Sequence, residues 1–511
     1  MRTKNSFRNI IVALVGQSMG IVLQFISRKV FIDMMPQELL GLNSVFANLL
    51  AVLSLAEMGI GSAITFSLYK PLAEHDKAKI ASIMTFYKRV YRVIAVVVTC
   101  FGALVIPFFP FIIKEKIDGI LLYYTLYLAS SVVSYLCAYK RTLIIADQKS
   151  YISSAYRYSY IVILNVVQII LLKLYQNYAY YLISQIVLSL LENILISMQA
   201  DRMYPYLKEK AAPLERMERK GFFKNIRALL MHRIGSIAVG NTDNILLSAI
   251  ESVNAVAVYS NYKLVFSGVN TIMNQVFSSV TASVGNLVAE KDKQYAYSIY
   301  KALLLGILCV FGLISICMVS LFNDFIQFWV GEQFVESIDY VIILVVHFFI
   351  SGVREPTNVF KNALGLFWND RYKAFIEAII NVILSIALGI AWGARGIFFA
   401  TILSGLLLPV WIEPFVLYKN YFKKPLTDYF RFILKNVVIV LLIGIVVYFL
   451  LQHFYVTSCL QLILKALVCL ILTGILMLII FGRTPECRYF LNIARNLISK
   501  YRRSKMGESK L

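Results

Sequence analysis

Residues 302–322 read ALLLGILCVFGLISICMVSLF, an apolar run in which no side chain is charged. A helix needs about 20 mostly apolar residues to cross the roughly 30 Å of hydrocarbon in a bilayer. Backbone groups in lipid have no water to bind, so they must be hydrogen-bonded within the segment, as they are in a helix. The run therefore predicts a transmembrane helix. The absence of Lys and Arg continues to residue 353, so the loop after this helix is also free of basic residues.

The composition of the whole chain points the same way. Its 511 residues are 59% hydrophobic and 15% charged, and the mean hydropathy is +0.72. A soluble domain is about half apolar and about a quarter charged, and a globular fold of this size could not bury so much apolar surface. We therefore predict an all-α integral membrane protein with about fourteen transmembrane helices. The expected spans are 9–32, 40–68, 90–112, 119–144, 154–174, 178–199, 224–249, 254–286, 298–322, 337–362, 374–393, 396–418, 432–452 and 459–482.

Basic residues are unevenly distributed among the loops. The formal net charge is +22, and Lys and Arg concentrate in alternate loops such as Lys70–Lys79 and Lys419–Lys424, whereas residues 302–353 and 436–464 contain none. Cytoplasmic loops are enriched in Lys and Arg, so the alternation predicts that both termini are cytoplasmic. Because the charge is spread over short loops and not gathered on one face, we expect the lipid bilayer as its partner and no nucleic acid.

The loops on the outer side are all short, so we expect no catalytic domain there and no enzymatic activity. No phosphate-binding loop with the Walker A spacing occurs. The seven cysteines and four histidines are scattered without the spacing of metal ligands, so we expect no metal site and no structural disulfide.

The sequence contains an internal repeat. A shift of 216 residues places Leu72–Lys77 (LAEHDK) on Val288–Lys293 (VAEKDK). With a few residues inserted, Tyr139–Lys140 then falls on Phe360–Lys361. Chance similarity of one hexapeptide is the alternative, but the order of helix lengths also matches. Six spans separate the two acidic–basic loops, so the halves should have the same orientation in the membrane, as in transporters built from parallel repeats.

This repeat defines the expected domains. Two parallel-related six-helix bundles should be followed by two C-terminal helices and a basic tail, whose apolar and basic residues alternate at helical spacing as in an amphipathic helix on the inner leaflet. The expected boundaries are 1–201 for the N-terminal bundle, 202–223 for a cytoplasmic basic linker, 224–422 for the C-terminal bundle, 423–482 for helices 13 and 14, and 483–511 for the tail.

Several ionisable residues interrupt the apolar spans, where a charge is costly and usually faces a cavity or a partner. Arg354 follows 52 residues without Lys or Arg, and its planar guanidinium matches phosphate oxygens bidentately. The alternative is an internal pair with Glu355 or Asp243. Arg28 and Lys29 are further candidates for binding an anion, but they lie near the end of their span, where long basic side chains can reach the headgroups.

Other polar residues are candidates for a cavity or for coupling, among them the acids Glu57, Asp243 and Glu355. Glu57 could bind a coupling proton or sodium ion, or hydrogen-bond neighbouring helices. Asn241, Asn244 and Lys263 could line a polar cavity, although interhelical packing explains the asparagines equally well.

Several motifs resemble those of Wzx-type polysaccharide flippases, which belong to the multidrug/oligosaccharidyl-lipid/polysaccharide exporter superfamily. The resemblance extends in order through essentially the whole chain. Its motifs are Leu55–Ile64 (LAEMGIGSAI), Ser67–Ala73 (SLYKPLA), Asn241–Leu247 (NTDNILL), Ala257–Tyr262 (AVYSNY), Ser283–Leu287 (SVGNL), Gly365–Tyr372 (GLFWNDRY) with Glu377 and Asn381, and Trp411–Pro414 (WIEP).

The resemblance implies movement of an undecaprenyl-diphosphate-linked oligosaccharide from the inner to the outer leaflet of a bacterial cytoplasmic membrane by alternating access. It implies a central cavity between the bundles, a hydrophobic groove formed by the last two helices, and coupling to H+ or Na+. Cationic residues would bind the pyrophosphate, and by position these are Arg28, Lys29 and Arg354. A polysaccharide polymerase and glycosyltransferases are expected partners in making capsule, exopolysaccharide or O-antigen.

A multidrug cation antiporter of the same superfamily is the alternative function. Its cavity should be acidic or neutral, to suit organic cations, whereas the three candidate cations favour an anionic cargo if they face inward.

Overall fold

The computed structural model of the chain describes residues 2–53, 60–135, 138–209, 212–214, 240–366, 369–454 and 456–490, and all regular secondary structure within these ranges is helical. The chain divides into two compact units, Met1–Ser260 and Asn261–Leu511. The domain boundaries drawn from the sequence stay predictions, and most of the expected basic linker and tail lies outside the described residues.

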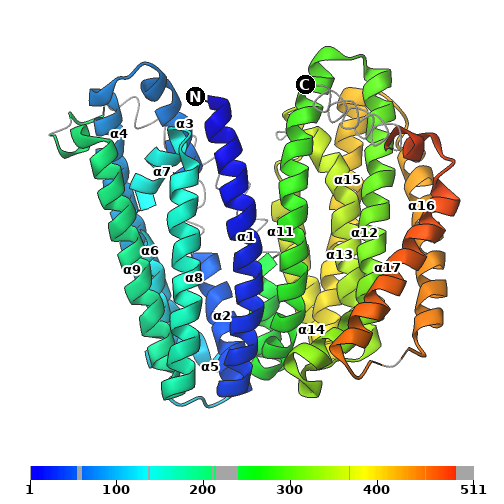
Figure 1. The fold of residues 1–511 in the computed structure, drawn as a ribbon, viewed down its shortest axis with the longest axis horizontal. Helices are drawn as coiled ribbons and strands as arrows, with labels where there is room; N and C mark the ends of the chain where they lie inside the picture. The colour runs from blue at the N-terminus through cyan, green and yellow to red at the C-terminus, as the bar shows by residue number, and fades with distance from the viewer. Residues whose placement is uncertain are drawn as a thin grey trace, which may run out of the picture. The chain divides into compact units, whose positions relative to one another are not determined.

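The N-terminal unit is built of helices (Figure 1). They are α1 (Arg2–Met34), α2 (Gln37–Leu53), α3 (Ile60–Ala73), α4 (Lys77–Val105), α5 (Phe109–Ile112), α6 (Ile120–Tyr135), α7 (Ala138–Ala146), α8 (Ser150–Tyr175), α9 (Tyr178–Met203), a helical stretch over residues 240–250, and the start of α11 (Val253–Glu290).

The C-terminal unit continues α11 and adds the remaining helices. They are α12 (Lys293–Val330), α13 (Ile338–Ala363), α14 (Lys373–Leu407), α15 (Pro409–Leu417), α16 (Leu426–Leu451) and α17 (Cys459–Phe481), with a π-helical turn at Tyr418–Phe422 after α15.

Where the structure describes them, the predicted apolar spans are helical, whereas residues 224–239 of span 224–249 lie outside the described residues. Within the described residues, seven helices are long and apolar enough to cross a membrane, or eight if the bent pair α6 and α7 forms one span. The chain is therefore a multi-pass membrane protein. The total of fourteen spans and the cytoplasmic location of both termini stay predictions.

Three spans differ in detail from the expectation. The helix of predicted span 90–112, α4, begins at Lys77 and not near residue 90. The Asp76 side chain accepts a hydrogen bond from the Lys79 backbone N–H (2.9 Å) and so caps a polar first turn. Span 119–144 is divided between α6 and α7. Span 40–68 corresponds to α2 and α3, and the residues between these helices lie outside the described part of the chain.

The predicted break between spans 374–393 and 396–418 coincides with a kink in α14. Gly393 has φ +61° and ψ −141° there, whereas its neighbours are helical. A positive φ is accessible to glycine without the steric cost that a Cβ would bring. The two predicted spans are therefore separated by a kink at a glycine, the residue type that adopts a positive φ most easily.

In the N-terminal unit α1 packs along α8, and α6 and α8 pack along α9 (Figure 1). The first turn of α11 is tied to this unit, because the Glu115 carboxylate accepts a hydrogen bond from the Val253 N–H at 2.8 Å. Gly41 of α2 permits the close approach, since a Cβ at this position would lie 1.9 Å from the Val253 carbonyl oxygen. The loop between α5 and α6 thus caps the beginning of α11.

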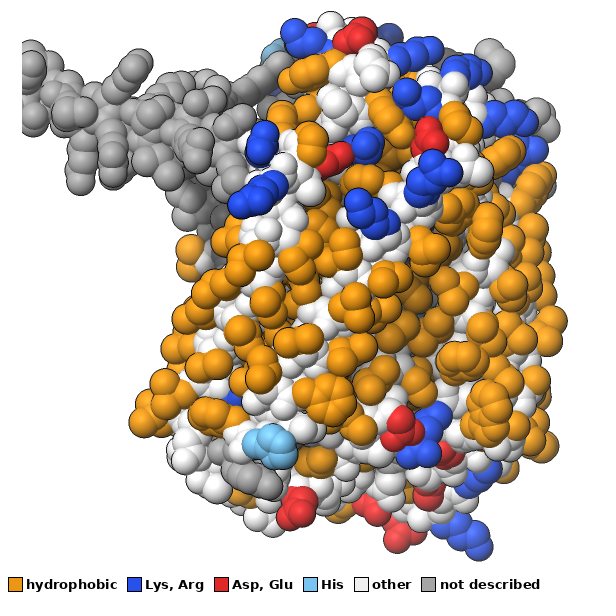
Figure 2. All heavy atoms as spheres, turned by 90° about the vertical axis from the view of Figure 1, so that its right-hand side faces the viewer, with side chains coloured by type: hydrophobic (Ala, Val, Ile, Leu, Met, Phe, Trp, Pro, Cys, Tyr) orange, Lys and Arg blue, Asp and Glu red, His pale blue; other side chains and the backbone are white. Residues whose placement is uncertain are grey.

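In the C-terminal unit α12 is central and packs against α13, α16 and α17. Gly352 of α13 lies directly on the Phe311 ring of α12, since a Cβ would come within 1.9 Å of it. The outward faces of α16 and α17 are apolar and exposed, with Leu434 and Ile479 each 67% exposed. Figure 2 shows a broad hydrophobic belt on this face, with most of the visible Lys and Arg beyond one edge and acidic side chains gathered beyond the other. Such a belt is the surface that lipid tails cover.

Candidate functional site

Arg354 forms an internal ion pair with Glu413. From α13, its Nε and Nη2 atoms donate to the two carboxylate oxygens of Glu413 in α15, at 3.0 and 2.7 Å. The Glu413 side chain is 1% exposed, and it also pairs with Lys373 at the start of α14. The alternative to phosphate binding, an internal ion pair, therefore occurs, but with a carboxylate 59 residues away and not with Glu355 or Asp243.

Further charges surround this pair. Lys361 forms an ion pair with Asp370, which lies 3.8 Å from Lys373. Glu355 and Glu377 lie near enough to Arg354 to interact electrostatically. The cluster thus contains three cations and four carboxylates, a net charge of −1. An ion cluster of this balance, with a bidentate pair at its centre, holds α13, α14 and α15 together and favours a structural role for Arg354.

The N-terminal unit contains a comparable cluster. Glu192 of α9 is 5% exposed and accepts from Arg141 of α7 at 2.6 Å, while Arg157 of α8 lies 3.6 Å from its other oxygen. Glu192 and Glu413 are 221 residues apart, the same separation as Lys140 and Lys361 in the sequence repeat. In each half, a buried carboxylate on the last helix of the bundle joins cations from the two helices before it.

Arg28 is the predicted cation that has no carboxylate within 4 Å among the described residues. It is partly buried on α1, and its Nη1 donates to the Ser260 hydroxyl at 2.9 Å. Tyr127 and Tyr181 lie close enough to interact with its charge. Lys29 differs, because it pairs with Asp33 one turn along α1 at 2.8 Å and both side chains are exposed by more than 40%.

The remaining predicted residues are distributed over both units. Asp243 and Asn244 are buried in the helical stretch before α11, and the Asn244 Oδ1 atom has no hydrogen-bond partner within the described residues. Asn241 lies on the same stretch and is partly buried. Lys263 lies on α11 and interacts electrostatically with His347 of α13. Glu57 lies outside the described residues.

Sequence reasoning missed Glu413, Lys373, Glu192 and Arg157 as partners in these clusters. Each had a signal. Arg157 and Glu192 interrupt predicted spans 154–174 and 178–199, and Glu413 lies within the quoted WIEP motif. Their pairing could not be predicted because it joins helices that are distant in sequence.

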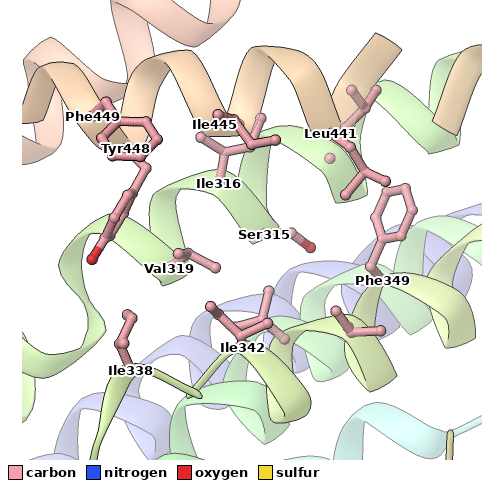
Figure 3. A pocket seen from close by; sticks show the side chains of 15 residues that line it. Ser315, Ile316, Val319, Ile338, Ile342, Phe349, Leu441, Ile445, Tyr448 and Phe449 are labelled. Atoms are coloured by element: carbon pink, nitrogen blue, oxygen red, sulfur yellow. The ribbon is translucent and has the colours of Figure 1, made fainter. Parts of the chain in front are cut away.

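Three hollows accompany these charges. An apolar groove of about 340 Å³ lies between α12, α13 and α16, and its lining side chains point into it (Figure 3). A polar hollow of about 200 Å³ shares Val319, Ile338 and Tyr448 with the groove. It contains the ion pair of Lys465 and Asp324, whose charged atoms are 2.7 Å apart. A third hollow, of about 300 Å³, lies within the N-terminal unit and is lined by Arg157 and several hydroxyl groups.

A small cluster of neutral oxygen atoms is buried between the two halves of α14. The Asn381 amide donates to the Thr401 and Ser404 hydroxyls at 3.1 and 3.3 Å. The Asn381 Oδ1 and Ser385 Oγ atoms have no hydrogen-bond partner in the described part of the chain. Oxygen atoms of this kind are ligands for hard cations.

No family model and no curated protein sequence matches this chain. Solved structures do match its fold. The lipid II flippase MurJ, in an inward closed conformation, superimposes with a TM-score of 0.68 at 16% identity, over 93% of this chain and 99% of that chain. A multidrug resistance MATE family transporter of the MOP superfamily, inward-facing, gives 0.55 at 14% identity over 80% and 99%.

A MOP superfamily transporter from Pyrococcus furiosus, whose binding pocket is described as reversed in polarity, gives a TM-score of 0.52 at 13% identity, over 82% of this chain and 96% of that chain. These likenesses confirm that the chain has the fold of the MOP-superfamily transporters and flippases, the superfamily that the motifs indicated. At such low identity they show the fold alone.

Proposed function

We propose that this protein is a flippase that moves an undecaprenyl-diphosphate-linked oligosaccharide from the inner to the outer leaflet of a bacterial cytoplasmic membrane. The observation that carries the proposal is Arg28, a partly buried guanidinium on α1, a helix that the sequence predicts to span the membrane, with no carboxylate within 4 Å among the described residues. A cation in that setting is costly unless an anion joins it, and a diphosphate supplies the geometry that guanidinium prefers.

The apolar groove supports the same function. Its lining is aliphatic and aromatic, and the labelled side chains in Figure 3 carry only the Ser315 and Tyr448 hydroxyls as polar atoms. A polyprenyl chain has no polar group along its length, so a hollow of this kind can hold part of it while the charged head is bound elsewhere.

We propose that transport proceeds by alternating access and is coupled to H+ or Na+. The buried oxygen cluster at Asn381 supports this, because two of its atoms, Asn381 Oδ1 and Ser385 Oγ, have no partner among the described residues. The cargo would come from membrane-associated glycosyltransferases and pass to a polysaccharide polymerase, for capsule, exopolysaccharide or O-antigen.

Proteoliposomes containing the purified chain test the proposal. Fluorescently labelled lipid-linked oligosaccharide is placed in one leaflet, a proton or sodium gradient is imposed, and transfer is measured by accessibility to an added lectin. We expect transfer that requires the protein and increases with one of the gradients. No transfer above protein-free liposomes, with authentic cargo and either gradient, would refute the flippase.

The alternative, a multidrug cation antiporter, is tested with the same liposomes. Efflux of a cationic dye driven by the gradient, without movement of lipid-linked oligosaccharide, would establish the antiporter. Arg28 argues against this outcome, because a nearby guanidinium repels an organic cation.

A further inference from the structure

The hollow within the N-terminal unit has the size, the polar lining and the charge of a binding site. It lies between α2, α6, α8 and α9 and has a volume of about 300 Å³. Ligand pockets begin at about this size, so the hollow suits one sugar residue with its phosphate and not a whole oligosaccharide.

Polar side chains on its wall have unused hydrogen-bonding groups. The side chains of Ser130, Gln185 and Ser189 line the hollow and form no hydrogen bond with any described residue, although Ser130 and Ser189 are each only 7% exposed. The hydroxyls of Tyr127 and Tyr160, also on the wall, have no such bond either. None of these polar atoms is among the fully enclosed unpaired atoms of the described residues, so each is accessible from the hollow and available to bond to a ligand.

The hollow is also electropositive. Arg157 lies on its wall, is 52% exposed, and stands 5.1 Å from the centroid of the Tyr160 ring. Its carboxylate neighbour, Glu192, lies 3.6 Å away but binds Arg141 more closely, at 2.6 Å. Two arginines therefore share one carboxylate, a net charge of +1. Arg28 adds to this, because it interacts electrostatically with Tyr127 on the wall.

We propose that this hollow binds a glycosyl phosphate, with Arg157 on the phosphate and the hydroxyl and amide groups on the sugar. The inference rests on the proposed flippase function, for which the site would hold the first sugar and phosphate of the cargo. Glu192 acts as a positioning residue, because it binds Arg141 and orients Arg157. Its single negative charge cannot neutralise both guanidinium groups. The comparable cluster in the C-terminal unit has a net charge of −1 and a bidentate pair, so it lacks the excess positive charge that an anion requires.

Calorimetric titration of the full-length protein in phosphatidylcholine nanodiscs tests the site, since no anionic lipid competes there. The probes are a set of hexose 1-phosphates, free glucose and inorganic phosphate. We expect a hexose 1-phosphate to bind more tightly than glucose or phosphate. Arg157→Gln should weaken its binding at least about tenfold, because a hydrogen bond to a charged group is lost, and Arg157→Lys should weaken it less.

Two further variants separate binding from folding. Ser130→Leu fills the hollow without changing any charge and should also abolish binding. Arg92→Gln removes an exposed arginine of α4 in the same unit and should have no effect. Binding of no hexose 1-phosphate by the wild type, or equal binding by wild type, Arg157→Gln and Ser130→Leu, would overturn the site.

The liposome assay then distinguishes this site from the proposed function. Lipid-linked oligosaccharide added to the nanodiscs should displace the bound hexose 1-phosphate, and failure to displace it would overturn the assignment to the cargo. Normal transport by both Arg157→Gln and Ser130→Leu would also overturn that assignment and leave the flippase intact. Binding by the wild type without transport of any lipid-linked glycan would refute the flippase and leave a soluble sugar phosphate as the ligand.

Discussion

At the scale of single residues, charges in the membrane helices differ in whether a carboxylate satisfies them. Lys29 and Arg354 each have one within hydrogen-bonding distance, whereas Arg28 bonds to the Ser260 hydroxyl. A serine hydroxyl compensates a guanidinium less than a carboxylate does, because it carries no net charge. Lys29 is thus paired within α1 and Arg354 joins α13 to α15, whereas Arg28 is the residue that we propose binds an anion.

We expect Arg28→Ala to lower transport of lipid-linked oligosaccharide at least about tenfold, because a charged hydrogen bond to phosphate is lost. Arg28→Lys should recover part of the rate, since a point charge lacks the planar fork. The measurement is the initial rate in proteoliposomes at equal protein content. Lys173→Gln, an exposed cation near the end of α8, is the control. Full activity of Arg28→Ala would remove Arg28 from the cargo site.

Arg354 leads to a different expectation. Arg354→Ala and Glu413→Gln should each lower stability, by up to about 3–5 kcal/mol, because each leaves part of a buried ion pair without its partner. The double variant should lose less than the sum of the two, since neither partner is then left alone. Thermal unfolding in detergent measures all three. Losses that simply add would show that the pair contributes no coupling energy.

At the scale of elements, close helix packing depends on small residues at defined contacts. Gly352 allows the Phe311 ring of α12 to lie against the α13 backbone. The sequence predicted both helices but not which residues meet. Contacts of this kind align α13 so that Arg354, half a turn further along, can reach α15.

Gly352→Ala should therefore destabilise the C-terminal unit by about 1–3 kcal/mol, the usual cost of overpacking. Phe311→Leu in the same chain should restore part of the loss, because a smaller side chain vacates the space. The melting temperatures of the two single variants and the double variant provide the test. If Gly352→Ala melts at the wild-type temperature, α12 and α13 move apart at this contact without losing stability.

The repeated carboxylates give the two halves a common organisation. Glu192 and Glu413 keep the separation of the sequence repeat, and each joins the two helices before its own. The cations do not occupy equivalent positions along the sequence, so the sequence comparison alone did not reveal the clusters. The net charge of each cluster, and hence its capacity to bind an anion, depends on these unaligned residues.

At the scale of the whole molecule, the charge pattern makes a topological prediction. In a cysteine-free background, His75→Cys should react with a membrane-impermeant maleimide only after permeabilisation, because its loop is rich in Lys and is expected to be cytoplasmic. Glu332→Cys should react in intact cells, because its loop carries no basic residue. Labelling of intact cells at both positions, or the reverse pattern, would contradict the predicted orientation.

The sequence by itself determined that this is an all-α membrane protein and where most of its long helices lie, because hydropathy acts locally along the chain. It also indicated the superfamily whose fold the structure has. Only the tertiary structure decided which intramembrane charges are paired. Arg354 meets Glu413 across 59 residues, and Arg141 meets Glu192 across 51. Such pairs depend on how helices pack. Because an unpaired charge in lipid is costly, an anion is expected to bind where packing has left a cation without a carboxylate.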